Sequence, residues 1–249
     1  MTNEELKHAV REKYASTVTE SSSCCGPNCG CGTSDTISIS MNDRYRGVDD
    51  NIVASADLGL GCGTPTAFAD LEKGMTVLDL GSGAGIDVFI AAKEVGPTGK
   101  AIGLDMTDEM LARANANKHK LGMSNAEFRI GEIEDMPVES ASVDRIISNC
   151  VINLVPDKRK AFAEMYRVLK PGGKFTVSDI VSIGRIPDEV RQDMELWAGC
   201  VAGALDKQEY LQIVKEAGFK DLNIAAEKTF EADTSVSFGL QSITLRAEK

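Results

Sequence analysis

The sequence predicts an α/β protein built on a doubly wound sheet. Between residues 75 and 181, five short apolar segments with strand character alternate with segments of helical period. Parallel strands need crossover connections, and the helices in those connections cover both faces of the sheet. A glycine-rich turn at 81–85 follows the first strand, which is where a Rossmann-like sheet binds its ligand. The expected fold class is therefore α/β and Rossmann-like.

Composition excludes several classes of function. The chain of 249 residues carries 27 Lys and Arg against 38 Asp and Glu, a net charge of −11, whereas a nucleic-acid-binding surface must be basic. No apolar run reaches the ~18 residues that a membrane span needs, and the charged N-terminal segment lacks the features of a secretory signal. We therefore expect a cytoplasmic protein with reduced thiols that binds neither nucleic acid nor membrane.

Local signals predict the elements in chain order. Residues 1–20 predict an amphipathic helix, because apolar side chains recur every four residues. The five strands are expected at 75–80, 100–106, 126–130, 142–149 and 174–181, with helices at 86–95, 107–122 and 156–170. Thr107 is placed to cap the second of these helices, and the Pro-Gly-Gly turn at 171–173 to stop the third. Beyond residue 183 we expect helices over 186–205 and 207–218, and then a hairpin at the sheet edge.

The glycine turn departs from the dinucleotide fingerprint. Gly81, Gly83 and Gly85 let the backbone approach a ligand closely, but Ile86 occupies the position of the third glycine in G-x-G-x-x-G. Asp79 would place a carboxylate where a pyrophosphate must lie. A carboxylate repels phosphate but attracts ammonium and sulfonium groups. S-adenosylmethionine (SAM) carries both cations and no phosphate, so we expect Asp79 and the three glycines to bind SAM.

A second carboxylate and two further motifs extend this cofactor site. Asp105 ends the second strand, where a carboxylate hydrogen-bonds ribose hydroxyls. With the GEIEDMP loop at 131–137 and the RVLKPGG turn at 167–173, the pattern over about 60–180 resembles the class I SAM-dependent methyltransferases. That resemblance implies a seven-stranded, mostly parallel sheet whose last strand is antiparallel.

The same resemblance assigns the loop after the third strand to the adenine ring. It implies that Ile133 and Glu134 lie beside the ring, with Glu132 as a weaker candidate. We also include Asn149, at the end of the fourth strand, among the cofactor-binding residues.

Seven cysteines form two groups. Four lie in the N-terminal loop, and three are isolated; they are Cys24, Cys25, Cys29, Cys31 and then Cys62, Cys150, Cys200. The clustered group could bind zinc, although its spacing is not that of paired C-x2-C knuckles, and an isolated cysteine can simply be a small hydrophobic residue. Position favours another interpretation. Cys150 follows the fourth strand, at the edge where a transferred methyl group should point, and three converging thiolates suit a soft thiophilic centre such as As(III).

Three cysteine-containing segments carry a closer resemblance, to the arsenite methyltransferases. They are LGLGCGTP at 58–65, SNCVINLVPDK at 148–158 and LWAGCVAGAL at 196–205. The resemblance implies that Cys62, Cys150 and Cys200 bind As(III) as substrate, with no stably bound metal cofactor. It also implies that one thiol of the Cys24–Cys25 pair, with Cys25 as our candidate, enters a redox cycle restored by thioredoxin or glutathione.

The predicted organisation has three parts. Residues 1–60 form the N-terminal helix and cysteine-rich loop, 61–182 the SAM-binding core, and 183–249 a C-terminal region that binds arsenic and completes the sheet. Two other functions stay open: a SAM-dependent C-methyltransferase acting on a quinone or other small molecule, and a non-catalytic protein that binds a metalloid or zinc through thiols. Convergence of the three isolated thiols beside the SAM cleft would favour the arsenite methyltransferase.

Overall fold

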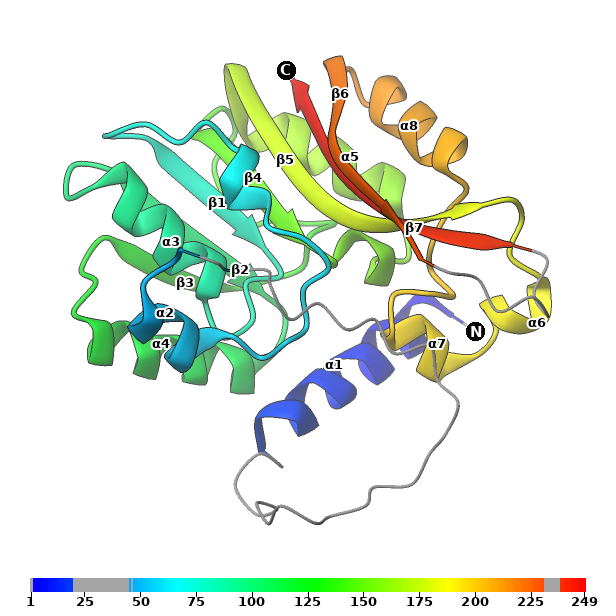
Figure 1. Ribbon diagram of the computed structural model, residues 1–249, viewed down its shortest axis with the longest axis horizontal. Helices are drawn as coiled ribbons and strands as arrows, with labels where there is room; N and C mark the ends of the chain where they lie inside the picture. Colours follow the sequence, from blue (N-terminus) through cyan, green and yellow to red (C-terminus); the bar gives the residue numbers. More distant parts are fainter. Residues whose placement is uncertain (1, 20–44, 46, 231–237) are drawn as a thin grey trace.

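The protein is built around one seven-stranded sheet (Figure 1). The computed structural model describes residues 2–19, 45, 47–230 and 238–249. The strand order is β3-β2-β1-β4-β5-β7-β6. Neighbours among the first five strands are parallel, and β7 is antiparallel to both β5 and β6. This confirms the predicted Rossmann-like sheet and its antiparallel last strand.

The strands are β1 (Thr76–Leu80), β2 (Lys100–Asp105), β3 (Ala126–Ile130), β4 (Val143–Asn149), β5 (Leu169–Ile183), β6 (Lys220–Thr229) and β7 (Gly239–Glu248). The α-helices are α1 (Asn3–Thr19), α2 (Asp50–Ala56), α3 (Ile86–Val95), α4 (Asp108–Leu121), α5 (Lys158–Val168), α6 (Asp188–Arg191), α7 (Met194–Ala198) and α8 (Lys207–Glu216). Two short 3-10 helices are η2 (Pro65–Phe68) and η3 (Ile152–Leu154). Among the described helices, none is long and apolar enough to cross a membrane.

Each face of the sheet has its own apolar core, because successive strand residues point to opposite faces. On β1, Leu78 packs with Phe162 of α5 and Tyr210 of α8. Its neighbour Val77 packs on the other face with Phe89 of α3 and part of α2. Helices therefore cover both faces, as in a doubly wound fold.

Three local expectations need correction. Helix α5 ends at Val168, and β5 already begins at Leu169, so the Pro-Gly-Gly segment lies inside the strand as an irregularity: Val143 pairs with Leu169 but Arg145 pairs with Lys174. The helix expected over 186–205 is instead two short helices, α6 and α7, followed by a non-helical segment. Thr107 occupies the N-cap position of α4, but its side chain makes no capping hydrogen bond.

The order of the strands fixes the place of a ligand. Strands β1 and β4 are neighbours at the centre of the sheet, and β2 lies on the other side of β1. This is the point where the strand order reverses, and ligands of such sheets bind outside the carboxyl ends of the strands there. Helix α1 contacts α4 and α7 and crosses this end of the molecule (Figure 1).

Candidate active site

A cleft at the carboxyl edge of the sheet consists of two adjoining hollows. The first is lined by residues of α1, the end of β2 and the loop after β3, among them Lys7, Val10, Leu104, Asp105, Met106, Glu132, Ile133, Glu134 and Val155. The second is lined by the glycine turn, the loop at 56–61 and the end of β4, among them Tyr45, Asp57, Asp79, Gly83, Asp87, Asn149 and Cys150. Tyr14, Gly81 and Val151 line both hollows. The structure therefore brings every predicted cofactor residue except Gly85 to the wall of one continuous cleft.

The glycine turn keeps the floor of this cleft open. Gly81 has φ 65°, and a Cβ there would lie 2.5 Å from the side chain of Val151. Gly85 has φ 95° and is the N-cap of α3, where a Cβ would lie 2.8 Å from Phe128. Both positions require glycine, for the backbone conformation and for the space.

Asp105 braces the turn from the next strand. Its carboxylate accepts the backbone N–H of Gly83 and that of Thr107, each at 2.9 Å. Burial raises the pKa of Asp105, and these two hydrogen bonds oppose that rise. The carboxylate thus has a fixed orientation at the first hollow.

Asp79 is a buried carboxylate that has no hydrogen-bond donor among the described residues. Only 3% of the residue is exposed, and its side chain accepts no hydrogen bond from the described part of the chain. Its pKa lies well above the usual range, because burial disfavours the charge and because Asp87 and Asp105 are close. Such a group suits a cationic ligand that enters the second hollow.

The loop carrying Cys62 is anchored by Asn149. The side-chain oxygen of Asn149 accepts the backbone N–H of Cys62 at 3.0 Å and of Gly63 at 3.1 Å. Its amide nitrogen lies within hydrogen-bonding distance of the Gly63 carbonyl, Asp87 and the Tyr45 hydroxyl. Asn149 was predicted as a cofactor contact; the structure places it at the wall of the second hollow with both ends of its amide engaged by protein groups.

Asp87 and Tyr45 belong to this anchor, and the sequence analysis missed both. Tyr45 donates its hydroxyl to Asp87 at 3.1 Å. Burial raises the pKa of Asp87 to about 6, against hydrogen bonds from Asn149 and Tyr45. An Asp in the first turn of a helix gives no distinctive signal in a sequence, and Tyr45 lies in a segment without a clear period.

The loop after β3 faces α1. Ile133 and Glu134 line the first hollow together with Glu132. Lys7 of α1 lies 2.7 Å from a carboxylate oxygen of each glutamate, and Glu134 also accepts the backbone N–H of Asp157 at 3.1 Å. The charged side chains of this loop therefore hold α1 over the cleft.

The three isolated thiols lie in one cluster, and Cys150 among them lines the second hollow. Cys62, Cys150 and Cys200 are 4%, 6% and 5% exposed and share one apolar cluster with Val10 and Leu154. The other two thiols are neighbours that act on the Cys150 thiol, and the Cys200 thiol donates to the Cys150 carbonyl at 3.1 Å. All three are free thiols.

Hydrogen bonding and burial keep two of these thiols protonated. The pKa of Cys150 lies well above its usual range because of its hydrogen bonds to Cys200 and Cys62 and because of burial, and burial raises the pKa of Cys62. Within the described ranges, no three His, Cys, Asp or Glu side chains already form a metal-binding group. Three-fold coordination therefore requires the three side chains to turn toward a common ligand.

Two of these cysteines have a backbone conformation that favours glycine. Cys150 has φ 61° and Cys200 has φ 64°. The left-handed backbone conformation costs a residue with a side chain roughly 1–2 kcal/mol, and such residues cluster at functional sites. The turn at Cys150 is fixed by its N–H, which donates to the carbonyl of Ser178 on β5 at 2.7 Å.

The Cys62 loop rests on β5 and β7. Ser242 of β7 donates its hydroxyl to the Cys62 carbonyl at 2.9 Å. A Cβ on Gly63 would lie 2.5 Å from the Ser178 hydroxyl, and one on Gly61 would lie 2.6 Å from the Asn149 amide. The glycines on both sides of Cys62 therefore allow the loop to lie against these side chains.

Cys200 is supported by residues of η3 and α5 that the sequence analysis did not single out. Asn153 donates to the carbonyls of Ile180 at 2.7 Å and Cys200 at 3.3 Å. Lys158 is buried and donates to the carbonyls of Asn153 and Val155, and its ammonium lies 5.6 Å from the centre of the Trp197 ring. These contacts give Asn153 and Lys158, both in the segment 148–158 that carries Cys150, a role in the support of Cys200.

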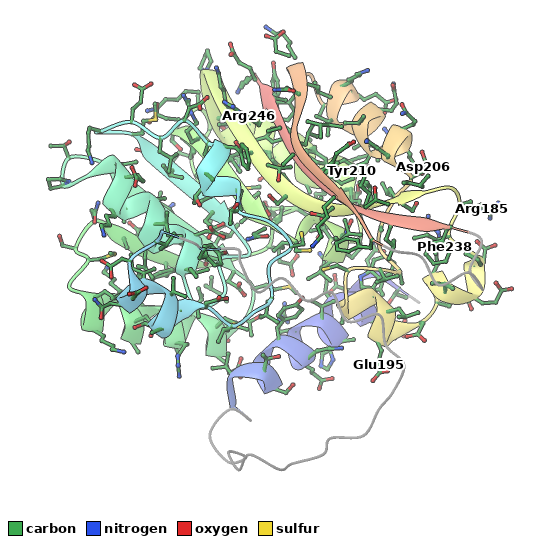
Figure 2. The ribbon with its side chains drawn as sticks, viewed as in Figure 1. Arg185, Glu195, Asp206, Tyr210, Phe238 and Arg246 are labelled. Atoms are coloured by element: carbon green, nitrogen blue, oxygen red, sulfur yellow. The ribbon has the colours of Figure 1, made fainter. Side chains whose placement is uncertain are left out.

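Two buried ionisable groups, Asp179 and Lys158, attract each other beneath this support. Asp179 of β5 accepts the hydroxyl of Tyr210 at 3.3 Å, and Tyr210 projects from α8 toward the sheet (Figure 2). Burial raises the pKa of Asp179 to about 7 and lowers the pKa of Lys158 to about 8, and in each case the attraction between the two groups opposes the shift. The predicted fourth thiol, Cys25, and its neighbours Cys24, Cys29 and Cys31 lie outside the described residues.

Comparisons with known proteins identify the family of the chain. A family model described as a methyltransferase domain matches residues 71–218. The arsenite methyltransferase of Halobacterium salinarum is 45% identical over 99% of this chain and 67% of its own length. The chain belongs to the arsenite methyltransferase family. The arsenite methyltransferase of Aquipseudomonas alcaligenes is 43% identical over 68% of this chain and 50% of its own length.

The family's fold is also shared in a solved structure. The crystal structure of CrArsM, an arsenic(III) S-adenosylmethionine methyltransferase from Chlamydomonas reinhardtii, superposes with a TM-score of 0.71 at 36% identity. The match covers 82% of the present chain and 71% of the algal chain. The present chain thus spans about two thirds of the first arsenite methyltransferase named above and half of the second.

Proposed function

We propose that this protein methylates trivalent arsenic with SAM as methyl donor, and so serves arsenic detoxification. The observation that carries the proposal is the cluster of three buried thiols, one of which, Cys150, lines the second hollow of the cleft. Three thiols that replace the three hydroxides of arsenite release three waters and leave an uncharged As(III) trithiolate. Three thiolates around Zn²⁺ would leave a net negative charge in an apolar site, which is costly. The chemistry of the cluster therefore favours As(III) over zinc.

The cleft suits SAM. In the first hollow, apolar side chains such as Ile133, Leu104 and Val155 can enclose adenine, and Asp105 can accept ribose hydroxyls. In the second hollow, the buried carboxylate of Asp79 can pair with the methionine ammonium. The open backbone at Gly81 joins the two halves. SAM, when bound, supplies the electrophilic methyl group.

The roles of the protein groups are binding and alignment. Cys62, Cys150 and Cys200 would hold arsenic in a pyramid with its lone pair free. Cys150 lies at the second hollow, so that lone pair can face the methyl group. No general base is needed, because the nucleophilic arsenic atom carries no proton. Positioning of two reactants in this way can contribute ~7–11 kcal/mol to catalysis.

The reaction also requires electrons. Transfer of the methyl group, with both electrons of the new bond from arsenic, raises arsenic formally to As(V). A further thiolate, for which we propose Cys25, can attack one arsenic-bound sulfur; the new disulfide leaves two electrons on arsenic and restores As(III). Thioredoxin or glutathione would then reduce the disulfide, which fits a cytoplasmic location.

The two alternatives account for less of the site. A quinone C-methyltransferase would use the same SAM cleft but has no use for three buried thiols beside it. A protein that only sequesters a metalloid would need the thiols but not the SAM-compatible hollows with Asp79 and Asp105.

The deciding experiment is a methyl-transfer assay with radiolabelled SAM, arsenite and a thiol reductant. We expect labelled methylarsenicals, separated by oxidation state, and no transfer to a quinone acceptor. Cys150→Ser and Cys200→Ser should abolish the label in arsenic and retain SAM affinity. Transfer to the quinone alone, or tight As(III) binding without transfer, would establish one of the alternatives instead.

A further inference from the structure

Tyr14 lies where the SAM cleft meets the thiol cluster. It lines both hollows and packs against the apolar cluster that contains the three thiols. Its hydroxyl donates to the carbonyl of Ala198, two residues before Cys200, at 3.4 Å, and the Cys200 thiol is one of its neighbours. Among the described residues that line both hollows, Tyr14 is the one that also carries a hydrogen-bond donor in its side chain.

Helix α1 fixes the position of this side chain. Lys7, Val10 and Tyr14 follow one face of the helix, at spacings of three and four residues, and all three line the first hollow. Lys7 ties the beginning of α1 to Glu132 and Glu134, and α1 also contacts α7, which precedes Cys200. One rigid element therefore spans the distance between the adenine end of the cleft and Cys200.

The hydroxyl of Tyr14 is a permanent donor. Burial and the neighbouring Cys200 and Cys150 thiols raise the pKa of Tyr14 well above its usual range, so the phenol stays protonated. In the free protein the Cys200 thiol donates its own hydrogen to the Cys150 carbonyl. When an As–S bond replaces the S–H bond, that donor is lost and the sulfur can only accept. The Tyr14 hydroxyl, which donates to the Ala198 carbonyl in the free protein, can then turn its hydrogen to this sulfur.

We propose that Tyr14 is a positioning residue for methyl transfer: its hydroxyl holds the arsenic-bound sulfur of Cys200 while its ring forms the wall between the two halves of bound SAM. One side chain would then align the arsenic lone pair with the methyl group of SAM. The inference rests on the proposed function and adds no covalent step to it.

The test compares Tyr14→Phe with the wild-type chain. Tyr166→Phe is the matched control, because Tyr166 packs against Phe219 and Lys249, away from the cleft. The single tryptophan, Trp197, lies three residues before Cys200, so its fluorescence reports As(III) binding; calorimetry reports SAM binding, and a single-turnover assay reports transfer.

We expect Tyr14→Phe to bind As(III) about five- to tenfold more weakly, the loss of one hydrogen bond, and to transfer the methyl group more slowly at saturating substrates. SAM affinity should stay within about twofold, because the ring is retained, whereas Tyr14→Ala should weaken SAM binding as well. Tyr166→Phe should match the wild type in all three measurements.

Two results would overturn the inference. One is a Tyr14→Phe chain with wild-type As(III) affinity and single-turnover rate; the other is a loss confined to SAM affinity, which would assign the hydroxyl to the cofactor. A wild-type chain that binds As(III) but transfers no methyl group would refute the proposed function instead, so the two failures are distinct.

Discussion

The side chain of Asn149 accepts the backbone N–H of Cys62 at 3.0 Å, so the last residue of a central strand holds a loop that lies 87 positions earlier in the chain. The same amide lines the second hollow. Asn149 therefore both anchors the Cys62 loop and helps to form the wall of the cofactor cleft.

Replacement of this anchor should release Cys62. We expect Asn149→Ala to weaken As(III) binding by about tenfold, because the loop loses two hydrogen bonds and buried partners are left unpaired. Trp197 fluorescence titration measures the change. Asn115→Ala removes a hydrogen bond from a side-chain amide on α4 and should bind As(III) like the wild type. Equal effects of the two variants would contradict the role of Asn149 as the anchor of the Cys62 loop.

SAM binding should release protons. Asp79 and Asp87 both have a raised pKa, that of Asp87 about 6, so both hold protons that ordinary aspartates have lost at the same pH. A bound cation favours the ionised carboxylate and lowers its pKa. At pH 6 we expect net proton release, about half a proton from Asp87 alone, and tighter SAM binding from pH 5 to 7.

The measurement is calorimetry in buffers of different ionisation enthalpy. Asp87→Asn should reduce the number of released protons. A binding enthalpy that is independent of the buffer would show that neither carboxylate changes its protonation when SAM binds.

The left-handed backbone at Cys150 should be visible in stability. Cys150→Gly relieves the conformation and Cys150→Ala retains it, so the glycine variant should have the larger free energy of unfolding, by roughly 1 kcal/mol. At Cys62, which is not among the described non-glycine residues with positive φ, the order should reverse because glycine adds chain entropy to the unfolded state. Urea denaturation measures both pairs; the same order at both sites would mean that Cys150 carries no strain.

Gly203 is where the Cys200 segment passes closest to η3. A Cβ there would lie 2.1 Å from the Asn153 carbonyl oxygen, so Gly203→Ala should force the two segments apart. Overpacking costs about 1–3 kcal/mol, which lowers Tm by roughly 2–4 °C per kcal/mol in a chain of this size, and As(III) affinity should fall with it. Gly239→Ala, with its nearest atom at 3.6 Å, is the control, and thermal melts that coincide for both variants would argue against the close contact.

The sequence predicts the core elements well because their signals are local. Strand β1 and helix α3 each combine an apolar pattern with glycines at the boundary, and α3 matches its predicted bounds of 86–95. The segment 186–205 has helical composition, yet it breaks after Arg191 because Asp193 caps a new helix and accepts the N–H of Leu196. Whether the segment forms one long helix or two short ones depends on what it packs against, and a single sequence does not contain that information.

In the candidate site, too, some residues could be predicted from the sequence and others could not. The thiols and the glycine turn could be predicted because their residue types are chemically distinctive. Asp87, Asn153 and Lys158 could not, since their roles come from contacts between segments far apart in the chain: Lys158, for example, acts on backbone carbonyls of η3 and on Trp197. Common polar residues acquire such roles through tertiary structure alone.

The position of β7 has a consequence for the biogenesis of the protein. This last described strand lies inside the sheet, between β5 and β6, and its Ser242 holds the Cys62 carbonyl. During synthesis the N-terminal parts of a chain emerge and begin to fold first, so a nascent chain can form β1 to β5 while Cys62 still lacks this support. The Cys62 loop therefore gains its hydrogen bond to β7 only after synthesis has passed residue 242.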